Sequence, residues 1–204
     1  MTRLPFATGF PGVDDAFGGI CPGEIAVFVG GPRTGKTAAL VHVAAHLNVP
    51  TMAFADPEAA PRFRGGTSRL DLMLEGSGLR RFDEIERLAL EARDVHGIGA
   101  VLLDDLQLLD GARCYGNDTP IRRSFWRFVR ESGLAVLASW GVEPRSGGGA
   151  RWSDLRGTIV EEPDLLMLVQ DTEAEPPAIR FASFHPMPRD HRDTFVHDRL
   201  CFVA

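Results

Sequence analysis

Residues 30–37 have the types and the spacing of a loop that binds phosphate groups. Two glycines open the segment, a third follows four residues later, and a lysine and a threonine close it; in order they are Gly30, Gly31, Pro32, Arg33, Thr34, Gly35, Lys36 and Thr37. Glycines let backbone N–H groups turn toward phosphate oxygens, and the start of a following helix adds partial positive charge. The segment fits G-x-x-x-x-G-K-[ST] at every position, so it predicts that these residues bind a nucleoside triphosphate.

Lys36 is the only lysine of the chain: of 22 Lys and Arg residues, the other 21 are arginine. A lysine ammonium is a compact charge, whereas a guanidinium is a wide planar fork that a tightly wound phosphate loop does not accommodate. Because every other basic Lys or Arg position is an arginine, the single lysine indicates that the geometry of the loop requires lysine here. The expected ligand is ATP, with the hydroxyl of Thr37 on Mg²⁺. The alternative is a chance glycine-rich turn.

Apolar runs and helical patterns around this loop predict the elements that position it. A buried strand at 24–30 precedes the loop, and a helix at 36–47 follows it. Further strands are expected at 50–55, 99–105, 134–139, 164–170, 178–184 and 200–204, with further helices at 80–97 and 120–133. Alternation of helices with wholly apolar strands predicts an α/β fold with a mostly parallel, twisted sheet, helices on both faces and an antiparallel or mixed C-terminal edge. A chain of 204 residues fits one domain, 1–204.

Two carboxylates end the expected strand at 99–105, and the carboxyl ends of parallel strands are where ligands bind in such sheets. Asp104 is the candidate for contact with Mg²⁺ alongside Thr37, and Asp105 is a candidate catalytic residue. The alternative is an acidic strand end that faces solvent.

Hydrolysis of a nucleotide also needs a group that orients or deprotonates the attacking water. Asp56 and Glu58 follow the expected strand at 50–55 and are the further candidates for this role. For each of them a polar loop at the rim of the sheet is the alternative.

Composition excludes several classes of protein. A net charge of −6 and a pI near 5.5 argue against a uniformly basic nucleic-acid binder, although a local basic stripe remains compatible with them. Three widely spaced cysteines suggest neither a disulfide framework nor a thiolate zinc site. The sequence has no signal-peptide pattern and no apolar run long enough to span a membrane, so we expect a cytoplasmic protein.

Four segments resemble the RecA-like ATPase domain of the DnaB-type replicative helicases. The segments are 8–30 (TGFPGVDDAFGGICPGEIAVFVG), 97–111 (GIGAVLLDDLQLLDG), 134–146 (LAVLASWGVEPRS) and 151–171 (RWSDLRGTIVEEPDLLMLVQD). The match at 153–156 (SDLR) and the Asp164 that follows it are what separate this family from other phosphate-loop proteins. The resemblance implies a RecA-like P-loop fold, binding of ATP and Mg²⁺, assembly into homo-oligomeric rings and single-stranded DNA as a partner.

Departures from the family pattern concern residues that act in hydrolysis. The simplest alignment places Pro57 where the family has a catalytic glutamate, with Asp56 and Glu58 on either side, and Trp140 where it has a glutamine. Ser183 and His185 stand where the family has a basic pair that acts across the subunit interface. An arginine finger is typically worth about 10³–10⁵ in rate. We therefore expect a compact, divergent relative, without the family's N-terminal domain, that binds ATP and hydrolyses it slowly.

Contact with DNA is expected, if it occurs, on two glycine-containing segments at 110–120 and 142–152. They hold Arg113, Arg145 and Arg151, which suit contact with a phosphate backbone without base readout. The alternative is a pair of solvated loops with incidental charge.

Three functions follow from these features. The first is a DNA-associated ATPase of helicase or translocase type. The second is a nucleotide-gated regulatory protein that acts through a protein partner with little or no turnover. The third, a phosphate-loop kinase for a small molecule, lacks a clear arginine-rich lid helix or acceptor pocket in the sequence.

Overall fold

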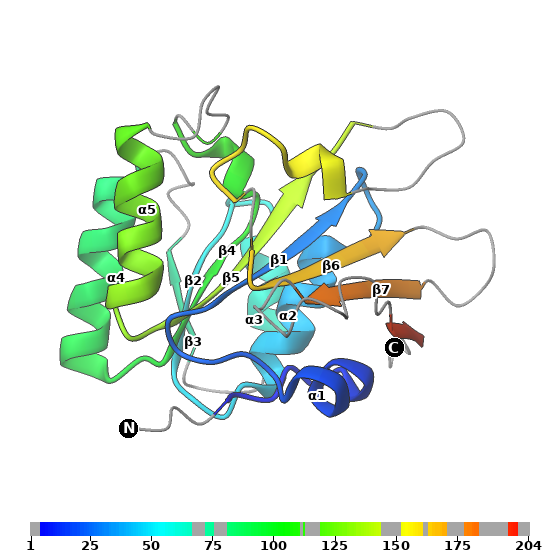
Figure 1. Ribbon diagram of the computed structural model, residues 1–204. Helices are drawn as coiled ribbons and strands as arrows, with labels where there is room; N and C mark the ends of the chain where they lie inside the picture. The colour runs from blue at the N-terminus through cyan, green and yellow to red at the C-terminus, as the bar shows by residue number, and fades with distance from the viewer. Residues whose placement is uncertain are drawn as a thin grey trace.

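The computed structural model of the chain describes residues 5–66, 72–75, 81–110, 112, 119–143, 152–160, 163–170, 178–183 and 196–199. These residues form one eight-stranded sheet (Figure 1). In spatial order its strands are β3 (Leu72–Glu75), β2 (Thr51–Phe54), β4 (Ala100–Leu103), β5 (Ala135–Gly141), β1 (Ile25–Gly30), β6 (Leu165–Gln170), β7 (Ala178–Ser183) and β8 (Val196–Arg199).

Neighbouring strands run parallel from β3 to β6, and β7 and β8 complete the edge in antiparallel pairing. The expected mostly parallel sheet with an antiparallel C-terminal edge is thereby confirmed. The segment 200–204, expected to be a strand, lies outside the described residues, and the described edge strand β8 directly precedes it.

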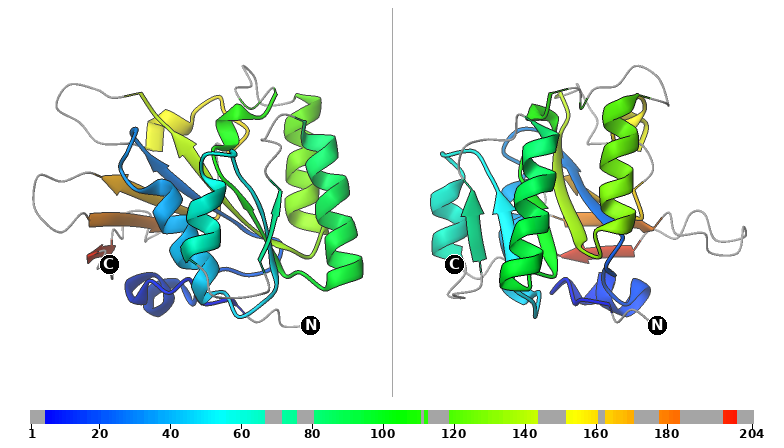
Figure 2. Two further views of the ribbon diagram at one scale, coloured as in Figure 1. Left: turned by 180° about the vertical axis from the view of Figure 1, so that it is seen from behind. Right: turned by 90° about the vertical axis from the view of Figure 1, so that its left-hand side faces the viewer.

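Helices cover both faces of the sheet (Figures 1 and 2). On one face lie α4 (Phe82–His96) and α5 (Pro120–Glu131), whose buried side chains pack with alternate residues of β1 such as Val27 and Val29. On the other face lie α1 (Pro11–Phe17), α2 (Lys36–His46) and α3 (Ala60–Gly66), which pack on the intervening residues Ala26 and Phe28. Because β1 alternates between two apolar cores, all of its residues are buried, as its continuous apolar run predicts.

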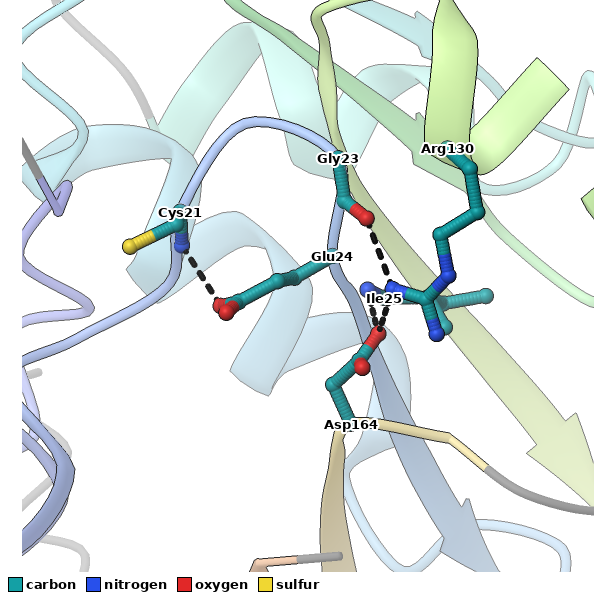
Figure 3. Close-up of polar contacts among 6 residues, drawn as sticks. All are labelled: Cys21, Gly23, Glu24, Ile25, Arg130 and Asp164. Atoms are coloured by element: carbon teal, nitrogen blue, oxygen red, sulfur yellow. Dashed lines mark hydrogen bonds and ion pairs between the residues drawn. The ribbon is translucent and has the colours of Figure 1, made fainter. Parts of the chain in front are cut away.

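The amino ends of β1 and β6 are joined by a partly exposed polar cluster (Figure 3). Asp164 Oδ2 accepts a hydrogen bond from the backbone N–H of Ile25 at 2.8 Å and another from Arg130 Nη1 at 2.8 Å. The same Nη1 donates to the carbonyl oxygen of Gly23 at 2.7 Å. Asp164 and Arg130 thus hold α5, β1 and β6 together at the end of the sheet away from the phosphate loop, which makes their role structural.

Further side chains of α5 also make hydrogen bonds to other parts of the chain. Besides Arg130, Arg122 donates to the carbonyl oxygen of Thr158 at 3.3 Å, and Trp126 Nε1 donates to that of Ile159 at 2.9 Å. These two bonds fasten the segment that follows the short helix η2 (Trp152–Leu155) onto α5. Within the described residues, no helix is long and apolar enough to cross a membrane.

Candidate nucleotide-binding site

The phosphate loop connects the carboxyl end of β1 to the first residue of α2, as the motif predicts (Figure 1). Gly35, the residue before the helix, has φ 100°, a conformation that favours glycine. A Cβ on Gly30 would lie 2.7 Å from the carbonyl oxygen of Val169 and would also overlap the hydroxyl of Thr34. Both glycines that the motif specifies, Gly30 and Gly35, are therefore required by the path of the backbone.

Two residues of this site hold strained backbone conformations. Arg33 (φ 62°) and Asp105 (φ 53°) are the non-glycine residues with positive φ in the part of the chain that the structure describes. Asp105 directly precedes the short helix η1 (Leu106–Leu108). Left-handed conformations cost free energy for residues with a side chain, and such strain clusters at functional sites. That both lie at the carboxyl end of the sheet singles out this end as the candidate site.

The Lys36 ammonium bends back over the loop and donates to the carbonyl oxygen of Gly31 at 2.8 Å. The Thr34 hydroxyl donates to the same carbonyl at 3.0 Å. Burial lowers the pKa of Lys36 from its ordinary value, while the negative charges of Asp105 and Asp104 oppose that shift. The ammonium therefore lies in a partly desolvated site and has one carbonyl partner, which phosphate oxygens would replace to advantage.

A continuous chain of hydrogen bonds joins α2 to the carboxyl end of β4 and to β5. The Thr37 hydroxyl donates to Asp104 Oδ2 at 2.9 Å, and the Ser139 hydroxyl of β5 donates to Asp104 Oδ1 at 2.7 Å. Ser139 Oγ also accepts the backbone N–H of Asp105 at 2.9 Å. Thr37 and Asp104, predicted from positions far apart in the sequence, thus meet directly. Ser139 was not predicted.

Asp105 lies in the same site, and burial raises the pKa of its carboxyl group above the ordinary value. The neighbouring charges of Asp104 and, more weakly, Asp56 act in the same direction, whereas the charge of Lys36 opposes it. Two adjacent carboxylates in a partly buried site repel each other, and a cation between phosphates and carboxylates would relieve that repulsion.

The other two predicted catalytic residues occupy different surroundings. Asp56 is partly buried, and its Oδ1 accepts the backbone N–H of Glu58 at 2.9 Å in the turn that leads into α3. Its charge reaches Asp105, so it belongs to the rim of the site. Glu58 is exposed. The structure therefore brings Asp105 and Asp104 together with Lys36, and it leaves Glu58 on the surface.

Trp140, at the position where the family pattern has a glutamine, is a core residue with 2% of its surface exposed. It packs in the apolar cluster beneath α4 and α5. A different amide reaches this end of β5: Gln107 of η1 accepts the backbone N–H of Gly141. Gly141 in turn is the register partner of Gly30, the first residue of the phosphate loop.

The oxygen atoms of Thr37, Asp104 and Asp105 suit Mg²⁺, which is usually held by one or two carboxylates together with substrate phosphates. Within the described residues no group of three or more His, Cys, Asp or Glu side chains could hold a metal by itself. Two carboxylates and one hydroxyl group leave coordination positions that substrate phosphates and water would fill.

Several predicted contacts lie outside the described residues. These are the three residues predicted to contact DNA: Arg113, Arg145 and Arg151. They stay predictions.

Comparison with solved structures identifies the fold. The chain matches a solved structure described as an ATPase domain with a TM-score of 0.71 and 19% sequence identity, over 99% of this chain and 88% of that one. The fold is that of a RecA-like helicase ATPase domain. A second match, with a TM-score of 0.69 and 17% identity, is to a DnaB-like replicative helicase whose structure was solved with its interactions with primase.

The second match covers 98% of this chain but 61% of the helicase chain. No protein-family model and no curated protein sequence matches the chain. At these identities the likeness concerns the RecA-like fold, so the chemistry of the site rests on its own residues.

Proposed function

We propose that this chain is a DnaB-type ATPase domain that binds ATP together with Mg²⁺. One observation carries the proposal: a complete phosphate loop whose Thr37 donates to Asp104 at 2.9 Å, at the carboxyl end of a parallel sheet. In the proposed complex the backbone N–H groups of the loop and the ammonium of Lys36 bind the phosphates. Thr37, with Asp104 behind it, holds the cation, which neutralises charge on the phosphates.

The same site supports slow rather than fast hydrolysis. Glu58 is exposed, and Trp140 is buried in the core. Among the candidate carboxylates, Asp105 suits the orientation of an attacking water best, because it is partly buried and its charge interacts with Lys36. Loss of a catalytic carboxylate and of a trans-acting cation would leave binding intact while it lowers turnover.

The exposure of Glu58 and the burial of Trp140 also favour the second function, a nucleotide-gated regulatory protein with little or no turnover. In that function ATP acts as a ligand that favours one state of the protein or its assembly. Binding of single-stranded DNA and assembly into a homo-oligomeric ring belong to the first function and follow from the resemblance to DnaB-type domains.

A turnover assay separates the two functions. Phosphate release from ATP is measured with and without single-stranded DNA over a range of protein concentrations, while light scattering reports the oligomeric state and a fluorescent ATP analogue reports binding. Turnover that rises with DNA and with oligomer formation supports the ATPase. Binding without turnover under every condition supports the regulator, and absence of binding contradicts both.

A further inference from the structure

Ser139 is a buried hydroxyl group at the centre of the proposed site. Its residue is 0% exposed, and it lies on β5 one position beyond Ala138, which pairs with Leu103 at the end of β4. This register places Ser139 beside the two carboxylates that follow β4. A hydroxyl buried at this position must find hydrogen-bond partners, because an unsatisfied buried polar group is costly.

The hydroxyl uses its donor and its acceptor on different residues. A serine has one O–H donor. Asp104 Oδ1 at 2.7 Å is a closer acceptor than Asp105 Oδ1 at 3.3 Å, so the proton goes to Asp104. The N–H of Asp105 donates to Ser139 Oγ at 2.9 Å. One side chain thus contacts both acidic residues.

The contact with Asp104 fixes the orientation of that carboxylate. Its Oδ1 accepts from Ser139 and its Oδ2 accepts from Thr37, so each oxygen has a hydroxyl partner. Because Thr37 directs its proton to Asp104, the lone pairs of the Thr37 oxygen are left for a cation. Ser139 therefore acts on Thr37 through Asp104.

The contact with Asp105 supports a strained turn. Asp105 has φ 53°, and its backbone N–H has Ser139 Oγ as its acceptor. Without that acceptor, the left-handed turn would carry an unpaired N–H in a partly buried site, which adds to its backbone cost.

We propose that Ser139 is a positioning residue for the divalent cation that accompanies the nucleotide, through its hydrogen bonds to Asp104 and Asp105. This inference rests on the proposed function, since it assigns a residue that prepares the same site. Hydrogen-bonding partners behind metal ligands typically contribute about 10- to 100-fold to metal affinity. The contribution of Ser139 should therefore appear in the dependence of nucleotide affinity on the cation and should be absent when no cation is present.

The test measures the dissociation constant of fluorescent ATP for wild type and Ser139→Ala, once with excess Mg²⁺ and once with EDTA. Binding of Mn²⁺ in the presence of the nucleotide, followed by electron paramagnetic resonance, gives a second readout. Ser132→Ala is the matched control, because Ser132 is also a buried serine (5% exposed) that accepts a backbone N–H, from Leu134 at 3.2 Å, beyond the other end of β5.

The expected result is that Ser139→Ala retains the wild-type affinity in EDTA and loses about 10- to 100-fold of the enhancement by Mg²⁺, with weaker Mn²⁺ binding. Ser132→Ala should keep the full enhancement. An unchanged enhancement in Ser139→Ala, or an equal loss of affinity with and without the cation, overturns the inference and leaves the proposed function standing. If wild type binds no nucleotide, the proposed function fails and this inference fails with it.

Discussion

The two ends of β1 hold their charges in opposite ways. At the amino end, Asp164 is paired with Arg130 and accepts the N–H of Ile25, so the negative charge has a cation and a backbone donor. At the carboxyl end, Asp104 and Asp105 are adjacent carboxylates, and the nearby ammonium of Lys36 is bonded to a carbonyl oxygen.

The two ends of β1 also differ in backbone strain. The positive-φ non-glycine residues of the described chain, Arg33 and Asp105, are at the carboxyl end. Sites that bind ligands commonly keep strain and like charges that lower stability until the ligand arrives. The amino end therefore contributes to stability, whereas at the carboxyl end the proposed binding of a nucleotide would offset the cost of backbone strain and adjacent like charges. Each variant below tests one side of this contrast.

Asp164→Ala should lower the free energy of unfolding by about 2 kcal/mol, within the range for hydrogen bonds to charged groups. Most of the loss comes from the N–H of Ile25, a fully buried residue, because the Arg130 side chain is 45% exposed and its ion pair is screened by solvent. Urea denaturation measures the loss, and nucleotide affinity should stay at the wild-type value.

Arg87→Ala is the control for that variant, because it breaks an ion pair with Glu91 whose side chains are 62% and 63% exposed. It should change the free energy of unfolding by less than about 0.5 kcal/mol. If Asp164→Ala is no more harmful than this control, or if it abolishes nucleotide binding, the amino end is not the purely structural region that the contrast requires.

Gly30→Ala and Gly31→Ala form a second pair, at the carboxyl end. A Cβ on Gly30 would collide with the Val169 carbonyl oxygen, whereas a Cβ on Gly31 would meet only the Thr34 methyl carbon at 3.6 Å. Gly30→Ala should therefore cost about 1–3 kcal/mol, as overpacking does. Gly31→Ala should be neutral or slightly stabilising, because it restricts the unfolded chain. Equal melting temperatures for the two variants would contradict the packing seen at Gly30.

Asp105→Asn should change stability less than Asp164→Ala or Gly30→Ala does, and in the opposite direction. It removes a carboxylate whose ionisation burial and Asp104 oppose, and asparagine tolerates the left-handed conformation. In EDTA at neutral pH the melting temperature of Asp105→Asn should therefore be higher than that of wild type.

The pH dependence of this gain has a defined sign. The pKa of Asp105 is higher in the folded protein than its ordinary 3.8, so folded wild type binds the proton more tightly than the unfolded chain does. Wild type therefore gains relative stability as pH falls through the folded pKa, and the advantage of asparagine should shrink and vanish below about 3.8. A lower melting temperature for Asp105→Asn at neutral pH would show that the carboxylate stabilises the empty site.

The fold and the phosphate loop could be predicted because their signals are local. The loop motif, its flanking strand and helix, and the apolar strands each occupy a short stretch of sequence, and Asp104 directly follows such a strand. In contrast, α3 carries a proline and two glycines within seven residues (APRFRGG), so its sequence has no clear helical pattern.

Ser139 could not be predicted, because in the sequence it is one small residue within an apolar strand. Its role depends on the pairing of β5 with β4, which are distant in the chain. The bond between Asp164 and Ile25 likewise joins residues 139 positions apart. Contacts of this kind follow from strand order, which periodicity does not specify. Only when the strand order is known does the sequence place Ser139, one position beyond the partner of Leu103, beside the residues that follow β4.

The most direct test of the account is calorimetric titration of ATP with Mg²⁺ into wild type, Lys36→Ala and Lys36→Arg. Wild type should bind about one nucleotide per chain through the phosphate loop. Lys36→Ala should lose the binding. Lys36→Arg should lose most of it as well, although it keeps the charge, because the loop requires a compact ammonium. Wild-type affinity in Lys36→Ala, or no binding by wild type, would contradict the assignment of the carboxyl end as a nucleotide site.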